Sequence, residues 1–285
     1  MLFLGNKLIN TKNNYVEVIT MTERYSTKAG RESHSLVEPA FFYGLGLVGR
    51  MLEGRVIPHA FYGGVGAQIY IAKALAGDKP IDTVPLVSAL TRKTSDYDIA
   101  IPVHEKEANL EASVGAFVGR NEYGFDTTFE EPSGDYIFQT RLDRMGSRRP
   151  VVVIKGGCIE ESGVWEESKI HVTFDKDEPH HTEMAESPRS SLIKLVHSRV
   201  GELEIVVAPI EYVIAGKLGR GNVNDIIDSL RVVNLYPSMD LDLLRDVAKR
   251  MAKTERRDQT GFYSIKGIEE LREYIESRLP ADFEG

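Results

Sequence analysis

Two aspartates two residues apart, Asp96 and Asp98, begin a short apolar run that ends at Pro102. In an extended strand alternate side chains share a face, so the two carboxylates would lie side by side. Neighbouring carboxylates repel each other unless a cation binds both, and Mg²⁺ takes one or two carboxylates beside water and substrate phosphates. The pair therefore indicates a metal site, with an Asp-rich turn that leads into an edge strand as the alternative.

A glycine pair lies upstream of these acids, where Tyr62-Gly63-Gly64 leads from an apolar strand pattern into a helical pattern that extends to Ala76. Glycine lets the backbone approach a phosphate closely, and the first amides of the following helix point at it. The pair thus favours a phosphate-binding turn. The alternative is a tight strand–helix turn without a ligand.

In this order, the two motifs resemble the nucleotidyltransferase superfamily with a DNA-polymerase-β-like core. The closer resemblance is to the AbiEii-type toxin branch, because Arg92, Thr94, Asp96 and Asp98 match its second motif, Arg-x-Thr-x-Asp-x-Asp. Residues 209–220 resemble the Lys-bearing helix of that branch, and residues 224–228 resemble its Lys/Arg-Asp-x-x-Asp segment. The resemblance covers roughly residues 55–232.

The resemblance implies transfer of a nucleoside monophosphate from a nucleoside triphosphate to an acceptor, with Mg²⁺ or Mn²⁺ as the cofactor. It assigns metal binding to Asp96 and Asp98, and balance of the triphosphate charge to a basic side chain, first of all Lys217. Asp225 would orient that lysine or act as a base. The expected nucleotide-binding residues are Gly63, Gly64, Arg92, Thr94, Lys217 and Arg220.

The later motifs also have plainer interpretations. Without the resemblance, Lys217 would be expected to be a solvated helix lysine. Asp225 and Asp228 are three residues apart and would share a helix face. They could simply be acids near a helix N-terminus capped by Asn222 or Asn224, where they favour the helix dipole.

A third carboxylate is common in the superfamily, and this chain departs from that pattern. The best-aligned position in the strand expected at 169–175 is His171, and Asp175 lies four residues further on. Either His171 as general base or Asp175 as third carboxylate would serve, and a surface histidine is the alternative. The adjacent His180 and His181 are expected in a loop and are a weak zinc signal, since the helical ligand spacing is absent.

The bulk properties fit an ordinary globular protein of 285 residues with a net charge of −8. This charge argues against a surface that coats nucleic acid generally. The single cysteine, Cys158, excludes an intramolecular disulfide and a cysteine-based zinc cage. No apolar run reaches the roughly 18–20 residues that span a bilayer, so we expect a cytoplasmic protein without a membrane partner.

The expected fold class is α/β (α+β): a nucleotidyltransferase-like mixed sheet with flanking helices. Residues 1–35 are an uncertain lead-in, 36–208 the α/β domain and 209–285 a helical C-terminal part. The toxin-branch resemblance suggests RNA, such as a tRNA end, or protein as the acceptor, and an antitoxin protein as a partner. The alternative function is a catalytically degenerate protein of the same fold that binds a nucleotide or partner without turnover.

The patterns place individual elements as well. Helices are expected at 36–52, 65–76, 104–119, 210–218, 223–233, 241–251 and 265–279. Strands are expected at 15–19, 55–62, 96–101, 136–142, 150–154, 169–175, 192–196 and 203–207. Residues 81–90 are expected to be a connection and 177–188 a loop.

Overall fold

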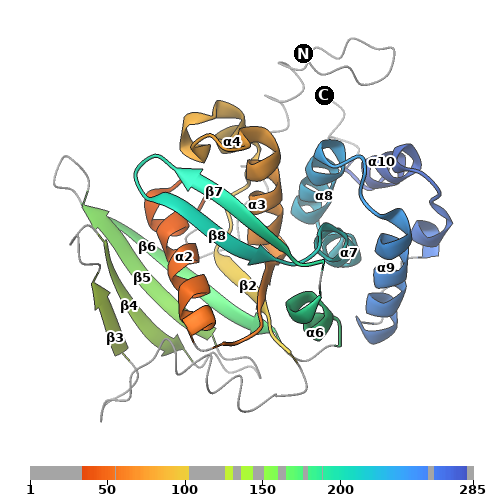
Figure 1. The fold of residues 1–285 in the computed structure, drawn as a ribbon. Helices are drawn as coiled ribbons and strands as arrows, with labels where there is room; N and C mark the ends of the chain where they lie inside the picture. Colours follow the sequence, from red (N-terminus) through yellow and green to blue (C-terminus); the bar gives the residue numbers. More distant parts are fainter. Residues whose placement is uncertain are drawn as a thin grey trace.

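A computed structural model describes residues 34–54, 56–102, 126–130, 136–143, 151–159, 165–175, 179–187, 189–255 and 260–280. In this part of the chain one mixed sheet has the strand order β3-β4-β5-β6-β2-β1-β8-β7 (Figure 1). The strands are β1 (Ala60–Tyr62), β2 (Asp96–Ala100), β3 (Asp126–Glu130), β4 (Tyr136–Asp143), β5 (Val151–Ile159), β6 (Trp165–Asp175), β7 (Ser191–His197) and β8 (Gly201–Val207).

Two neighbouring strands in the sheet carry the motifs: β1 leads into the glycine pair Gly63-Gly64, and β2 carries Asp96 and Asp98. β2 runs antiparallel to β1 and parallel to β6, and β1 runs parallel to β8. The buried residues Phe61 and Tyr97 point toward α2 (Pro39–Gly54), where the Tyr97 ring packs on Phe41 at 4.7 Å. Because side chains alternate along a strand, Asp96 and Asp98 point to the other face of β2.

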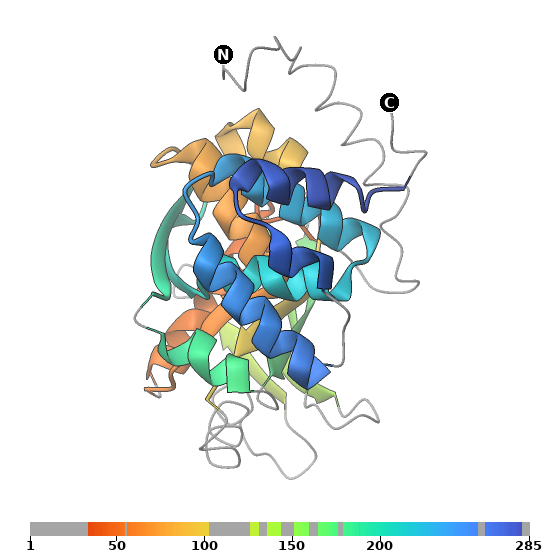
Figure 2. The same cartoon turned by 90° about the vertical axis from the view of Figure 1, so that its right-hand side faces the viewer.

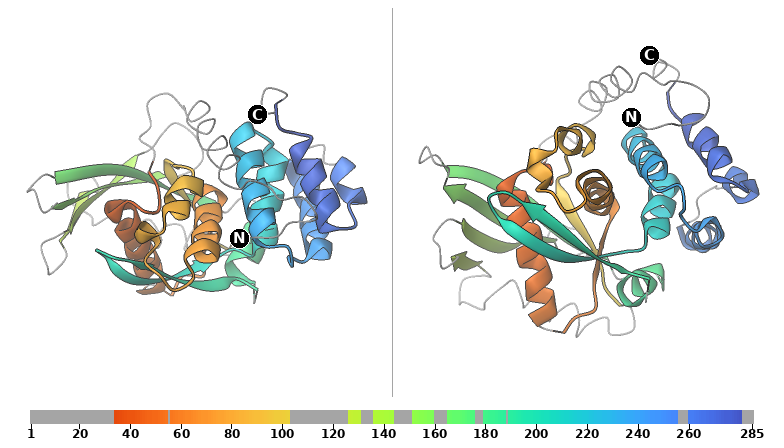
Figure 3. Two further views of the ribbon diagram at one scale, coloured as in Figure 1. Left: turned by 90° about the horizontal axis from the view of Figure 1, so that it is seen from above. Right: turned by 45° about the horizontal axis from the view of Figure 1, so that its top comes forward.

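Helix α3 (Gly63–Ala76) follows β1 directly and lies between the sheet and the C-terminal helices (Figure 3). It packs against β1, β2 and β7, and on its other side against α7 (Ile210–Arg220) and α8 (Val223–Leu235). The remaining C-terminal helices, α9 (Leu241–Glu255) and α10 (Ile268–Glu276), cover α7 and α8 from outside (Figure 2). One apolar core extends through these layers.

Local sequence explains the boundaries around α7 and α8. α7 ends at Gly221, whose φ of 64° lies in the left-handed region that glycine adopts freely. The side-chain oxygen of Asn222 then accepts a hydrogen bond from the amide of Asp225 at 2.9 Å, which caps α8. This short connection sets α8 beside α7 and brings its first turn back toward Lys217.

The expected fold class is confirmed, since a mixed sheet carries flanking helices and the described chain from Ile210 onward is helical. Several elements differ from expectation. The loop expected at 177–188 contains α6 (Pro179–Glu186), and the connection at 81–90 contains η1 (Ile81–Thr83) and α4 (Pro85–Leu90). The strand expected at 55–62 is only β1, and the helix expected from Val65 begins at Gly63.

The C-terminal helix expected at 265–279 is shorter, because η2 (Thr260–Ser264) is followed by α10 only from Ile268. The elements expected at 15–19 and 104–119 lie outside the described residues. Among the described helices, none combines the length and apolarity needed to cross a bilayer.

Candidate active site

The first turn of α3 lies against the carboxylate of Asp98. Gly63 has a φ of 63°, and it follows Tyr62, the residue paired with Asp98 in the β1–β2 ladder. A Cβ built on Gly63 would lie 1.9 Å from Oδ2 of Asp98, which no real side chain tolerates. Glycine at this position therefore allows both the left-handed backbone and the meeting of helix N-terminus and carboxylate.

Gly64 makes a second close approach, to the segment before β2. A Cβ built on Gly64 would lie 2.7 Å from Oγ1 of Thr94 and 3.6 Å from Nη2 of Arg92. The Thr94 hydroxyl donates a hydrogen bond to Oδ1 of Asp96 at 3.1 Å. The first amides of α3, which have no acceptor within the helix, thus lie beside the expected nucleotide-binding residues and both half-buried aspartates.

Lys217 is buried, with 1% of its surface exposed, and it bridges two acids of the next helix. Its Nζ donates to Oδ1 of Asp225 at 3.2 Å and to Oδ2 of Asp228 at 2.6 Å. A buried ammonium group is costly unless it is paired and hydrogen-bonded, and these carboxylates on one face of α8 provide both. The interpretation of Lys217 as a solvated helix lysine is therefore wrong.

Two arginines extend this pairing to form the ion-pair cluster, which we define as Arg92, Lys217, Arg220, Asp225 and Asp228. Arg92 donates to Oδ2 of Asp228 from Nε at 3.2 Å and from Nη2 at 3.1 Å. Arg220 binds both carboxylate oxygens of Asp225, from Nε at 3.0 Å and from Nη2 at 3.1 Å. Such two-point pairs fix orientation as well as charge.

The cations of the cluster keep both of its acids ionised. Burial alone would raise the pKa of Asp228, but the charges of Arg92 and Lys217 hold that pKa far below its usual range. Burial would likewise raise the pKa of Asp225, and the charge of Lys217 with the hydrogen bonds from Arg220 lowers it instead. Both acids therefore act as fixed negative charges that position the basic side chains.

The ion-pair cluster interacts electrostatically with β2, because Arg220 feels the charge of Asp98. Burial lowers the pKa of the Arg220 guanidinium, but the hydrogen bonds and charge of Asp225 outweigh this, and the carboxylate of Asp98 adds to the rise. The side chain of Arg220 is 37% exposed, so it lies between the buried cluster and solvent. The structure thus brings the expected residues of three separate motifs into one region.

Sequence reasoning missed one basic residue of this region, Arg231. It is 7% exposed, donates from Nη1 to the carbonyl of Leu90 at 2.9 Å, and contributes positive charge beside Asp228. Its position three residues after Asp228 on α8 was the available signal. The alternative reading of Asp225 as a first-turn acid also holds, because Asn222 caps the helix at its amide.

The expected third acidic position lies on β6, parallel to β2. The register places His171 beside Asp96, Thr173 beside Asp98, and Asp175 two residues further along the strand. A threonine therefore occupies the backbone position next to Asp98. His171 and Asp175 flank that position along β6, and their roles stay predictions.

His180 and His181 are buried in α6 and not in a loop. The ring of His181 packs against the ring of Tyr62 at 5.7 Å, so α6 abuts the end of β1. Within the described part of the chain, no group of three or more His, Cys, Asp or Glu side chains is placed to hold a metal ion together.

Comparisons with known proteins assign no family to this chain. No family model matches the chain, and no curated protein sequence matches it. A solved structure, that of the nucleotidyltransferase toxin MenT4 from Mycobacterium tuberculosis, is similar with a TM-score of 0.47 and 15% sequence identity. The match covers 85% of this chain and 84% of that one.

Proposed function

We propose that this protein transfers a nucleoside monophosphate from a nucleoside triphosphate to an acceptor, in a reaction that depends on Mg²⁺ or Mn²⁺. One observation carries the proposal: the N-terminus of α3 meets the carboxylate of Asp98 at Gly63, where a Cβ would lie 1.9 Å from Oδ2. A helix N-terminus binds phosphate, and a carboxylate beside it would repel that phosphate unless a cation lies between them.

Asp96 and Asp98 fit a divalent cation. They stand two residues apart on one face of β2, and both are half-buried. Two neighbouring carboxylates suit Mg²⁺, which keeps water and phosphate oxygens in its shell. When bound, the metal would supply neutralisation of charge on the reacting phosphates.

The first-turn amides of α3, from Gly63 to Val65, would bind the β- and γ-phosphates. Arg92 is a cation close to this turn, since its Nη2 lies 3.6 Å from the Cβ position of Gly64. Lys217 is enclosed by two acids, so we assign it the role of holding Asp225 and Asp228. Those acids in turn orient Arg92 and Arg220 toward the site.

The same geometry argues against Asp225 as the base. Its carboxylate accepts hydrogen bonds from Lys217, Arg220 and Asn222, and its lowered pKa makes it a weak proton acceptor. We therefore place the proton acceptor for the attacking hydroxyl on β6, at Asp175 or His171.

The acceptor is proposed to be RNA, including a tRNA end, or protein, by analogy with toxin-type nucleotidyltransferases. An antitoxin partner and a cytoplasmic location belong to the same proposal. A second candidate function, nucleotide binding without turnover, is favoured by one observation: the β6 residue in register with Asp98 is Thr173 and not an acid.

The test measures pyrophosphate release from each of the four ribonucleoside triphosphates, with Mg²⁺ or Mn²⁺ and bulk RNA. The variants are Asp96→Asn, Asp98→Asn and, as control, Asp78→Asn, whose side chain is 95% exposed. Release by wild type and the control, but not by the other two, supports the transferase. Metal-dependent nucleotide binding without pyrophosphate release supports the second candidate. Nucleotide affinity that is the same in wild type, Asp96→Asn and Asp98→Asn contradicts both candidate functions.

A further inference from the structure

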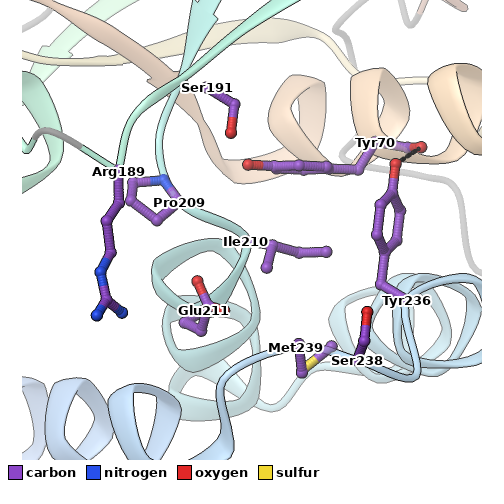
Figure 4. A pocket seen from close by; sticks show the side chains of 9 residues that line it. All are labelled: Tyr70, Arg189, Ser191, Pro209, Ile210, Glu211, Tyr236, Ser238 and Met239. Carbon is purple, nitrogen blue, oxygen red and sulfur yellow. Dashed lines mark hydrogen bonds between the residues drawn. The ribbon is translucent and has the colours of Figure 1, made fainter.

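A cavity of about 320 Å³ lies between the middle of α3, the N-terminus of α7, β7 and the segment that follows α8 (Figure 4). We call it the α3–α7 cavity. Its volume falls at the lower end of the range for small-molecule sites, roughly 300–1,000 Å³. Six residues separate its Glu211 from Lys217 along α7, about 9 Å at the helical rise of roughly 1.5 Å per residue. The cavity is therefore separate from the candidate active site.

One charged group in the wall is buried without a cationic partner. Glu211 is 8% exposed, and its Oε1 accepts a hydrogen bond from the amide of Asp240 at 3.0 Å. The described residues provide no ion pair for it, and it lines the cavity from the first turn of α7 (Figure 4). Glutamate is rarely so buried unless it is paired, because removing an ionised carboxylate from water is costly.

Aromatic and aliphatic side chains form the rest of the wall. The rings of Tyr70 and Tyr236 meet edge to face, with centroids 5.5 Å apart and planes at 84°. Their hydroxyls are already used, because Tyr70 donates to the carbonyl of Ala208 at 2.8 Å and Tyr236 to that of Tyr70 at 2.9 Å. The rings therefore offer their π-systems, and Ile210 and Met239 add an apolar floor.

Arg189 also borders the cavity, but its charge is neutralised by an ion pair with Asp240. Its Nη1 lies 2.9 Å from Oδ2 of Asp240, and its side chain is 60% exposed. Glu211 thus remains a buried acid of the cavity wall that has no ion pair with any described residue. Its place in the first turn of α7 explains an acid there but not its burial beside two tyrosine rings.

We propose that the α3–α7 cavity binds a small organic cation, a protonated amine on an aromatic or other apolar body. The ammonium group would donate to the second carboxylate oxygen of Glu211, and the body would pack against the exposed sides of the Tyr70 and Tyr236 ring pair. A cation over aromatic faces and a charge-assisted hydrogen bond are both strengthened where water is excluded. This inference does not depend on the proposed transferase function.

The test uses three probes that share one body and differ in charge: 2-phenylethylammonium, 2-phenylethanol and phenylacetate. Each is titrated into the full-length protein by calorimetry. The ammonium should bind at least about tenfold more tightly than the other two, as expected for a charge-assisted hydrogen bond. Equal affinities, or no detectable binding of the ammonium, would overturn the proposal.

Glu211→Gln keeps an oxygen for the amide of Asp240 and removes only the charge. It should weaken ammonium binding by about tenfold or more and leave 2-phenylethanol unchanged. The matched control is Asp242→Asn, which removes a nearby acid whose side chain is 88% exposed. Ammonium affinity that is unchanged in Glu211→Gln, or lowered equally in the control, contradicts the proposal.

A measurement on the wild-type protein covers the case in which Glu211→Gln does not fold. With ¹³C-methyl-labelled methionine, 2-phenylethylammonium should shift the Met239 methyl signal, which Met239→Leu assigns by its disappearance. Shifts confined to other methionines would place the ligand elsewhere and overturn the proposal. Asp96→Asn should bind the ammonium as wild type does, because the two sites are separate.

Discussion

Replacement of Lys217 by methionine tests whether the ion-pair cluster stabilises the protein. Methionine is unbranched and fits irregular core space, so the change mainly removes the ammonium. Asp225 and Asp228 would then remain buried, each with 4% of its side chain exposed. Their remaining partners would be the two arginines, Arg220 and Arg92.

Breaking a buried ion pair by removing one partner costs about 3–5 kcal/mol. We expect Lys217→Met to lie at the lower end, about 3 kcal/mol, because each acid keeps a guanidinium partner. The matched control is Lys73→Met, since that helix lysine also pairs with an aspartate at 3.1 Å but is 34% exposed, and its partner Asp78 is 95% exposed. An exposed pair contributes at most about 1 kcal/mol.

The assay is urea unfolding followed by circular dichroism, with both variants compared with wild type at neutral pH. A loss of free energy of unfolding below about 1 kcal/mol for Lys217→Met, or one no larger than for Lys73→Met, would refute the argument.

Two further predictions concern Gly63 and pH. Gly63→Ala and Gly77→Ala should both lose unfolding free energy, by roughly 1 kcal/mol or more, because both residues have positive φ. Only Gly63→Ala should also lose metal-dependent nucleotide binding, because its Cβ would meet Asp98, whereas nothing lies within 4 Å of a Cβ at Gly77. Equal effects would contradict the packing argument. Because the folded-state pKa of Asp225 and Asp228 lies below the unfolded value, their contribution to stability is complete above about pH 4 and is lost as pH falls through the folded pKa. As pH is lowered from 6 to 2, the urea midpoint of unfolding should therefore fall more steeply for wild type than for Asp228→Asn. Parallel curves would show that Asp228 is not a source of the acid sensitivity.

Much of the site was accessible from residue types and spacing, because short-range rules govern its local parts. A glycine pair between strand and helix, and two acids in alternation on the next strand, require only strand and helix geometry. The β1–β2 pairing that sets Tyr62 opposite Asp98 then follows from two consecutive central strands.

The burial of Lys217 could not be read from its own surroundings. It depends on Gly221 and Asn222 turning the chain so that Asp225 and Asp228 face α7, and on Arg92, 136 residues before Asp228, closing the other side. Long-range pairing of this kind leaves no periodic signal in the sequence.

The helix α6 was missed for a related reason. Pro179, His180 and His181 follow a charged segment, and the proline beside these charges favours a loop, yet Pro179 suits the first turn of a helix. Tertiary contacts then hold the helix, since Glu183 accepts a hydrogen bond from the Tyr212 hydroxyl at 2.7 Å and His181 packs on Tyr62.

The charge balance of the site links its architecture to the proposed chemistry. Arg92, Lys217, Arg220 and Arg231 provide four positive groups, against four acids: Asp96, Asp98, Asp225 and Asp228. The buried acids Asp225 and Asp228 bind most of these positive groups in ion pairs. A triphosphate that approaches the α3 N-terminus would therefore find little unbalanced positive charge near Asp96 and Asp98, and it would need divalent cations to bind beside them. If the proposed function is correct, triphosphate affinity should depend steeply on Mg²⁺ or Mn²⁺, and equal affinity in the presence of excess chelator would exclude this arrangement.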